Sequence, residues 1–196
     1  MTAPIIQLIR HGESIANAGG ISRTPACIPL SEKGQKQALV LADQFPKPPD
    51  LIVISAFIRT HQTAAPLLQK YPHVPVETWP VHEFTYLAHH SYNNTTEAQR
   101  TPAAKAYWNR LDPDYCDGPG AESFADFIAR ADALMAKLAT QTHSHISIFT
   151  HSFFISAVQW RSLNPQAEVN ADFIRGYLDF RLKNPVENAH PLPFQR

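Results

Sequence analysis

Five side chains could do chemistry together because each stands shortly after an apolar run of the chain: Arg10, His11, Arg59, Glu83 and His151. A planar guanidinium group can hold two oxygens of a phosphoryl group, so a pair of arginines suits a doubly charged oxyanion. The same positive charges would oppose a bound cation, which argues against two histidine ligands to a metal. The set therefore favours phosphoryl transfer near neutral pH, without a metal ion or a cofactor.

Each of these side chains alone also has an ordinary structural explanation. An arginine can pair with a surface carboxylate, a histidine can be a hydrogen-bonded turn residue, and a glutamate can be a solvated loop acid. The functional interpretation depends on whether the fold brings the five side chains to one place.

Buried strands separated by helices are the elements that must position them. Apolar runs predict strands at residues 5–9, 51–54 and 146–149, and residues 74–79 form a weaker, proline-containing candidate for a sheet edge. The alternation of strands and helices predicts an α/β fold with three α/β/α layers, a mostly parallel sheet and helices on both faces. Ligands bind beyond the carboxyl ends of such strands, where all five side chains are expected.

The remaining periodicities predict the helices and a last strand. Ser31 is the expected N-cap of a helix that ends at a proline cluster, and Pro66 predicts a late start or a kink in the helix after Arg59. Apolar residues at helical spacing predict a helix over 124–138, and another follows the strand at 146–149. The alternating segment 177–182 predicts a final strand.

Residues 84–120 show no clean period, and we interpret them as an insertion within a single domain that spans 1–196. A partial helix is expected over 103–111. The insertion could be a lid over the site or a satellite packing cluster. Aromatic residues crowd it and its edge: Phe84, Tyr86, Tyr92, Tyr107, Trp108 and Tyr115.

Composition limits the partners that can be expected. The net charge is zero, so there is no global electrostatic case for a nucleic-acid or membrane partner. Two distant cysteines suit a reducing compartment, and no apolar run is long enough to span a bilayer. We therefore expect a cytoplasmic protein without a nucleic-acid or membrane partner. No sequence feature marks an oligomeric interface.

Short motifs follow one another in a fixed order along most of the chain: Leu8 to Ser14 with Asn17, Pro29 to Gly34 with Gln37 and Ala38, Ser55 to Arg59 with Gln62 to Ala64, Glu83, Gly120 to Ser123 with Arg130, and Thr150 with His151. Together they resemble the signature of the histidine phosphatase superfamily, which includes the cofactor-dependent phosphoglycerate mutases. An Arg-His-Gly triplet alone would be weak evidence, whereas the ordered set is specific. The resemblance implies a phosphoglycerate mutase-like fold.

The resemblance also implies a role for each residue. His11 would be the nucleophile and would form a phosphohistidine. Glu83 would protonate the leaving alkoxide and then, as a carboxylate, activate water. The phosphoryl oxygens would be held by four side chains: Arg10, Asn17, Arg59 and His151.

Two positions depart from the family pattern. Ser152 stands where family members usually carry glycine, so it could crowd the pocket or add a hydroxyl donor to the bound phosphate. Cys27 stands where an aspartate is common. Four other histidines have no counterpart in the signature, and we interpret them as solvated loop residues rather than a metal site: His89, His90, His143 and His145.

Three functions fit these observations. The first is a metal-independent phosphomonoesterase that acts on a small-molecule phosphomonoester. It is favoured because the insertion is shorter than in typical glycolytic mutases, so that water is the expected acceptor. The second is a phosphoglycerate mutase-type phosphoryl transfer. The third is a non-catalytic protein that binds a phosphorylated ligand on an enzyme fold. The sequence does not distinguish sugar phosphates, nucleotides, phosphopeptides and inositol phosphates as substrates.

Overall fold

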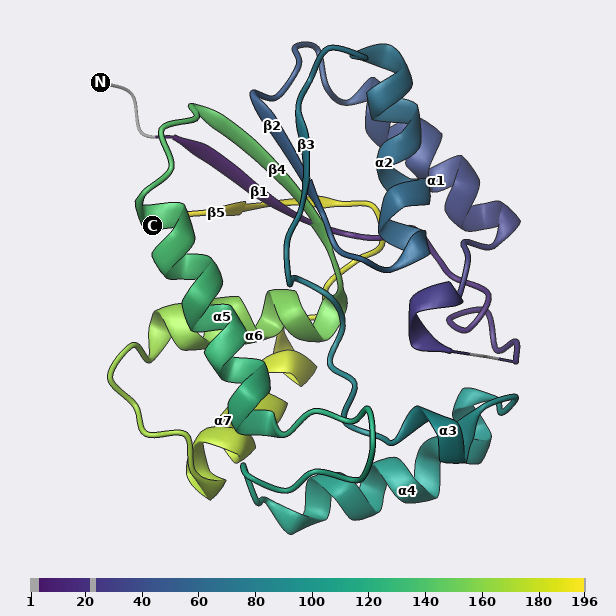
Figure 1. The fold of residues 1–196 in the computed structure, drawn as a ribbon, viewed down its shortest axis with the longest axis vertical. Helices are drawn as coiled ribbons and strands as arrows, with labels where there is room; N and C mark the ends of the chain where they lie inside the picture. Colours follow the sequence, from purple (N-terminus) through teal and green to yellow (C-terminus); the bar gives the residue numbers. More distant parts are fainter. Residues whose placement is uncertain (1–3, 22–23, 196) are drawn as a thin grey trace.

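A five-stranded sheet forms the centre of the computed structural model, which describes residues 4–21 and 24–195 (Figure 1). The strand order is β3-β2-β4-β1-β5, in which the first four are parallel and β5 is antiparallel to β1. The strands are β1 (Ile5–Arg10), β2 (Leu51–Ile54), β3 (Val76–Thr78), β4 (His145–Thr150) and β5 (Pro191–Phe194). The predicted mostly parallel α/β sheet is confirmed, with the weak third strand at its edge.

Two groups of helices cover opposite faces of the sheet (Figure 1). Alternate strand residues divide between two hydrophobic clusters: Leu8 and Ile148 belong to the larger one, Ile9 and Phe149 to the smaller. The smaller cluster is closed by α1 (Glu32–Asp43) and α2 (Ile58–Lys70). The larger is closed by three helices: α5 (Phe124–Ala139), α6 (Ser152–Leu163) and α7 (Ala171–Lys183). The sheet is thus the middle of three layers.

The helix predicted after Ser31 is confirmed, and Ser31 caps it by accepting a hydrogen bond from the Gly34 backbone N–H. For α2 we predicted a late start or a kink; the late start is wrong, and the kink stays a prediction. That helix begins at Ile58 and continues through Pro66 to Lys70. Its face toward α1 and the sheet is buried, including Ala64 and Leu67, and this packing outweighs the backbone hydrogen bond that a proline removes.

The strand predicted over residues 177–182 is also wrong. These residues belong to α7, which Asn170 caps by accepting hydrogen bonds from two backbone N–H groups. Phe173 and Tyr177 are four positions apart and both buried, which is helical spacing. The last strand is instead β5, which pairs with β1 along one edge of the sheet, where its prolines are tolerated.

The insertion contains two helices, α3 (His89–Tyr92) and α4 (Glu97–Arg110), and α4 is longer than the partial helix predicted there. A 3-10 turn, η1 (Pro25–Cys27), lies in the earlier loop. Phe84 and Tyr107 are buried in the larger hydrophobic cluster with Phe124 and Phe127. The aromatic residues of the insertion therefore pack against the main core, and a lid movement of this segment stays a prediction.

Candidate active site

A cavity of about 630 Å³ opens beyond the carboxyl ends of the parallel strands. Four predicted residues from three segments of the chain line it: Arg10, His11, Arg59 and Glu83. His151 lies directly behind them, with its ring 5.0 Å from the His11 ring, centroid to centroid. We call these five residues the inner end. Arg10 on β1 pairs with Thr150 on β4, and His11 and His151 follow these two residues directly. This strand register explains why the two histidines lie together.

His11 is held as a neutral imidazole with one free nitrogen. It is 3% exposed, and its Nδ1 lies 2.6 Å from the backbone oxygen of Gly12. Because a carbonyl oxygen can only accept, Nδ1 carries the hydrogen and Nε2 keeps its lone pair. Burial, followed by the nearby charges of Arg59 and Arg10, lowers the pKa of His11 well below its usual range. Nε2 is therefore available as a nucleophile at neutral pH.

Both arginines of the inner end are fixed by backbone carbonyls. Arg10 Nη1 donates to the Val186 oxygen at 2.7 Å, and Arg59 Nη1 donates to the Pro25 oxygen at 2.7 Å. Burial lowers the pKa of Arg59 to about 10, partly opposed by the charge of Glu83, so both guanidinium groups are charged at neutral pH. Each keeps further N–H donors for an anion in the cavity.

Residues 186–189 cross the end of β1 and tie the motif to the last strand. Beside the bond from Arg10 to Val186, the side-chain amide of Asn188 donates to the His11 carbonyl at 2.8 Å. The Ala189 N–H donates to the Arg10 carbonyl at 2.9 Å. The backbone of the nucleophile segment is thus held from the far end of the chain.

Close backbone packing fixes the loop after His11. A Cβ atom added to Gly12 would lie 2.5 Å from the Gly34 carbonyl oxygen, so any larger residue would push α1 away. Gly12 N–H also donates to the Thr63 hydroxyl on α2 at 3.0 Å. Glycine is required here for contact with a neighbouring helix.

The Glu83 carboxylate is positioned by two backbone groups. It accepts hydrogen bonds from the N–H of Phe84 and from the N–H of Phe153, both at 3.1 Å. Phe153 lies in the first turn of α6, whose N-terminus favours a negative charge. The Glu83 carboxylate thus lines the cavity and is held there by the N-terminus of α6.

His151 is fully buried between His11 and the Phe57 ring. Its Nε2 lies 2.8 Å from the Ser55 hydroxyl, whereas its Nδ1 is buried and has no hydrogen-bond partner within the described residues. Burial and the charge of Arg59 lower the pKa of His151 well below its usual range. His151 is therefore neutral, with one ring nitrogen unsatisfied.

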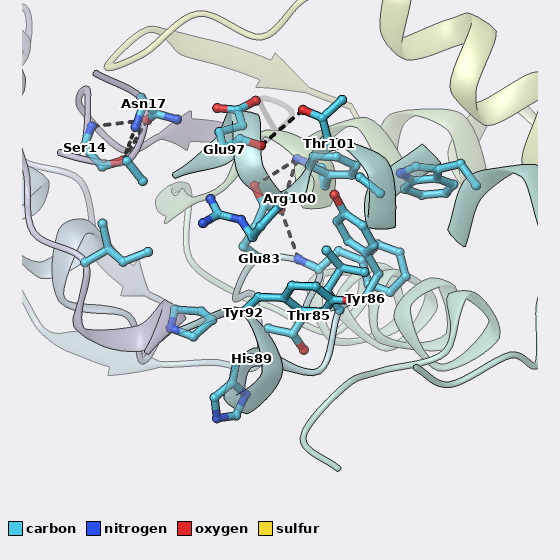
Figure 2. Close-up of a pocket in the computed structure, with 18 of the residues that line it drawn as sticks. Ser14, Asn17, Glu83, Thr85, Tyr86, His89, Tyr92, Glu97, Arg100 and Thr101 are labelled. Carbon is cyan, nitrogen blue, oxygen red and sulfur yellow. Dashed lines mark hydrogen bonds between the residues drawn. The ribbon is translucent and has the colours of Figure 1, made fainter. Parts of the chain in front are cut away.

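The two other predicted phosphate contacts differ in position. Asn17 lines the cavity, and its Oδ1 accepts from the backbone and hydroxyl of Ser14, which leaves the amide N–H₂ for a ligand (Figure 2). Ser152 begins α6 but does not line the cavity. Its contact with phosphate stays a prediction. Cys27 is exposed at the end of η1.

The opposite part of the cavity is mainly aromatic. We call its residues the outer wall: Tyr86, Tyr92, Trp108, Phe153 and Arg181. Figure 2 shows Tyr86 across the pocket from Asn17. Sequence reasoning missed Phe153 and Arg181 as site residues. Arg181 lies one helical turn after the buried Tyr177, so a helical interpretation of 177–182 would have placed the two on the same side of α7.

The described ranges 4–21 and 24–195 contain no group of three or more histidine, cysteine or acidic residues arranged to hold a metal ion. None of the helices in the same part of the chain is long and apolar enough to cross a membrane.

The chain belongs to the histidine phosphatase superfamily (branch 1), whose family model matches residues 6–174. A curated relative from Schizosaccharomyces pombe, named a probable phosphatase, is 32% identical over 109 residues, which is 55% of this chain and 49% of the relative. The chain thus aligns with about half the length of that protein.

Solved structures have the same fold. A mycobacterial glucosyl-3-phosphoglycerate phosphatase in complex with VO3 is 27% identical, with a TM-score of 0.66 over 88% of this chain and 85% of that one. A phosphoserine phosphatase from Entamoeba histolytica, in complex with 3-phosphoglyceric acid, gives a TM-score of 0.70 at 19% identity, over 98% and 95% of the two chains. The second likeness concerns the fold alone.

Proposed function

We propose that the protein is a metal-independent phosphomonoesterase that acts on a small phosphorylated metabolite through a phosphohistidine at His11. The observation that carries the proposal is the neutral His11 imidazole, whose Nδ1–H is bound to Gly12 and whose Nε2 is free, between two charged arginines. Membership of the superfamily and the phosphatase names of the two relatives above 25% identity support the same activity.

In the first step, Nε2 of His11 forms a bond to phosphorus while the bond from phosphorus to the leaving oxygen breaks. Glu83 acts as the general acid and gives a proton to the departing alkoxide. Negative charge that develops on the phosphoryl oxygens is stabilised by the N–H donors of Arg10 and Arg59. The amide of Asn17 adds a neutral donor from the loop that follows His11.

In the second step, a water molecule attacks the phosphorus of the phosphohistidine, and the Glu83 carboxylate accepts a proton from that water. The phosphorus–nitrogen bond breaks, which returns neutral His11 and releases inorganic phosphate. His151 supports the ring of His11 by edge contact, and its unsatisfied Nδ1 is the atom that would meet a phosphoryl oxygen.

Hydrolysis of phenyl phosphate in the presence of a chelator tests the proposal. The wild-type protein should release phosphate, and His11→Ala should lower kcat/KM at least about a thousandfold, because the nucleophile is removed. His61→Ala is the matched control, since His61 is an exposed histidine on α2 outside the cavity lining, and it should retain activity. Turnover by His11→Ala at the wild-type rate would reject the nucleophile.

The same preparation separates the other functions. A mutase would keep its phosphoenzyme in water and would exchange phosphate between 3- and 2-phosphoglycerate with a bisphosphorylated primer. A binding protein would hold a phosphoester at the inner end without releasing phosphate from any member of a substrate panel. Rapid phosphate release through His11 contradicts both.

A further inference from the structure

Within the described residues, the outer wall contains a cation, Arg181, that has no carboxylate partner. Arg181 lies in the last turns of α7, with its guanidinium carbon 3.4 Å from the centroid of the Phe153 ring. Its Nε is buried and has no hydrogen-bond partner among the described residues. An arginine head group stacked on a ring in a cavity presents its remaining N–H groups at the edge of its plane.

Neighbouring charged residues of the same helix are paired, which makes Arg181 different. Arg175 pairs with Asp172 and Lys183 pairs with Asp179. Within the described part of the chain, no carboxylate lies within ion-pair distance of Arg181. A partly buried charge without a partner is unfavourable, and an anion bound in the cavity would compensate it.

The acidic residues that line the cavity do not remove this charge. The Glu83 carboxylate is already bound to two backbone N–H groups, and Glu97 is exposed on α4. Arg181 is close enough to Arg10 for its charge to lower the pKa of Arg10, although burial is the larger cause. Arg181 therefore extends the positive potential from the inner end along the wall.

Aromatic rings line the cavity beside Arg181. The ring planes of Trp108 and Phe153 lie within 11° of each other, with 6.0 Å between centroids, and Tyr86 contacts both rings. All three line the cavity. A leaving group that lies against these rings would have an apolar body, and its far end would meet Arg181.

We propose that Arg181 is a specificity-determining residue that binds a second anionic group, a carboxylate or a phosphate, on the leaving group of the substrate. The substrate class is then a phosphomonoester whose apolar or aromatic body carries a second anion. This inference rests on the proposed phosphomonoesterase function and concerns the part of the substrate that is not transferred.

Three aryl esters test it: phenyl phosphate, 3-carboxyphenyl phosphate and 4-carboxyphenyl phosphate. The wild-type protein should prefer at least one carboxylated ester to phenyl phosphate by roughly tenfold or more in kcat/KM, the size expected for a charge-assisted hydrogen bond. Arg181→Gln should bring that ratio close to one. Arg175→Gln, on the exposed side of the same helix, should leave the ratio as in the wild type.

Arg181→Lys provides a second variant if the glutamine variant does not fold, and it should keep only part of the preference because lysine lacks the planar fork. Calorimetric binding of the same esters to His11→Ala gives a readout without turnover, so failure of the nucleophile and failure of the anion site are distinguishable. Absence of a preference in the wild type would overturn the inference. So would an equal loss with all three esters in Arg181→Gln, which would place Arg181 on the transferred phosphoryl group.

Discussion

The inner end and the outer wall are held by different kinds of contact. At the inner end, Arg10, His11 and Arg59 each bind a backbone carbonyl at 2.6 or 2.7 Å. The outer wall is held mostly by rings against rings, such as Trp108 on Phe153 and Tyr86 on Trp108. Backbone hydrogen bonds fix a side chain in one direction, whereas ring contacts tolerate small shifts.

This difference separates the chemical step from the choice of substrate. The inner end meets a phosphoryl group, which is the same in every phosphomonoester, and rigid donors suit it. The outer wall meets the variable part of the substrate, and a wall of side chains can change without moving the strands. Substitutions at the inner end should therefore lower the rate of phosphoryl transfer, whereas substitutions at the outer wall should change stability and substrate selectivity.

Among the substitutions that test this difference, Arg59→Gln should have the largest effect on kcat/KM. Loss of a charged donor to the phosphoryl oxygens should lower kcat/KM for phenyl phosphate about 10²–10³-fold. Arg59→Lys should fall between, because lysine keeps the charge and loses the fork. Steady-state kinetics measure both, with Arg110→Gln on α4, outside the cavity lining, as the control. A loss below tenfold in Arg59→Gln would contradict a direct role of Arg59 in binding the transferred phosphoryl group.

A smaller effect, on stability, is expected from Trp108→Ala. The ring contacts those of Phe84, Tyr86 and Phe153, so its removal should cost about 2–4 kcal/mol of unfolding free energy, and Trp108→Phe should cost less. Urea unfolding measures the change. Activity on phenyl phosphate should fall less than in Arg59→Gln. An equal fall in a folded Trp108→Ala protein would mean that the wall takes part in the chemical step.

The smallest expected effect is a pH dependence of stability set by the half-buried His82. Burial, and then Arg130, lower the pKa of His82 to about 4, while an unfolded histidine titrates near 6.5. The unfolded chain then binds more protons as pH falls through 6.5, so stability is greatest above that pH and declines towards pH 4. Urea midpoints at pH 7 and pH 5 should differ less in His82→Gln than in the wild type. An unchanged difference would contradict the neutral state of His82.

Much of the inner end could be predicted because strand positions decide it. The apolar runs that became β1, β2 and β4 placed Arg10, Arg59 and His151 beyond the same edge. The backbone partners of these side chains could not be predicted. Val186 and Pro25 contribute carbonyl oxygens, which any residue carries, so residue type gives no signal for them.

The outer wall was harder to predict from the sequence because its position depends on whether residues 177–182 form a helix. Residues 177–182 alternate apolar and polar types, which suits a strand, yet the cap at Asn170 and the buried Phe173 upstream favour a helix. In the helix, Arg181 turns towards the ring of Phe153. The helix signals at Asn170 and Phe173 thus outweigh the short alternating pattern over residues 177–182.

The hydrogen bonds between segment 186–189 and the end of β1 can form only late in synthesis. Arg10 and its anchor at Val186 are 176 positions apart, so the motif leaves the ribosome long before the residues that hold it. Synthesis proceeds at roughly 5–20 residues per second, which leaves β1 without the β5 partner for about ten seconds or more. The other partner of β1, β4, also comes late in the chain, so both edges of β1 are unpaired for most of that interval and Arg10 is unanchored. A chain interrupted before residue 186 would carry the whole motif and lack the geometry that makes it reactive.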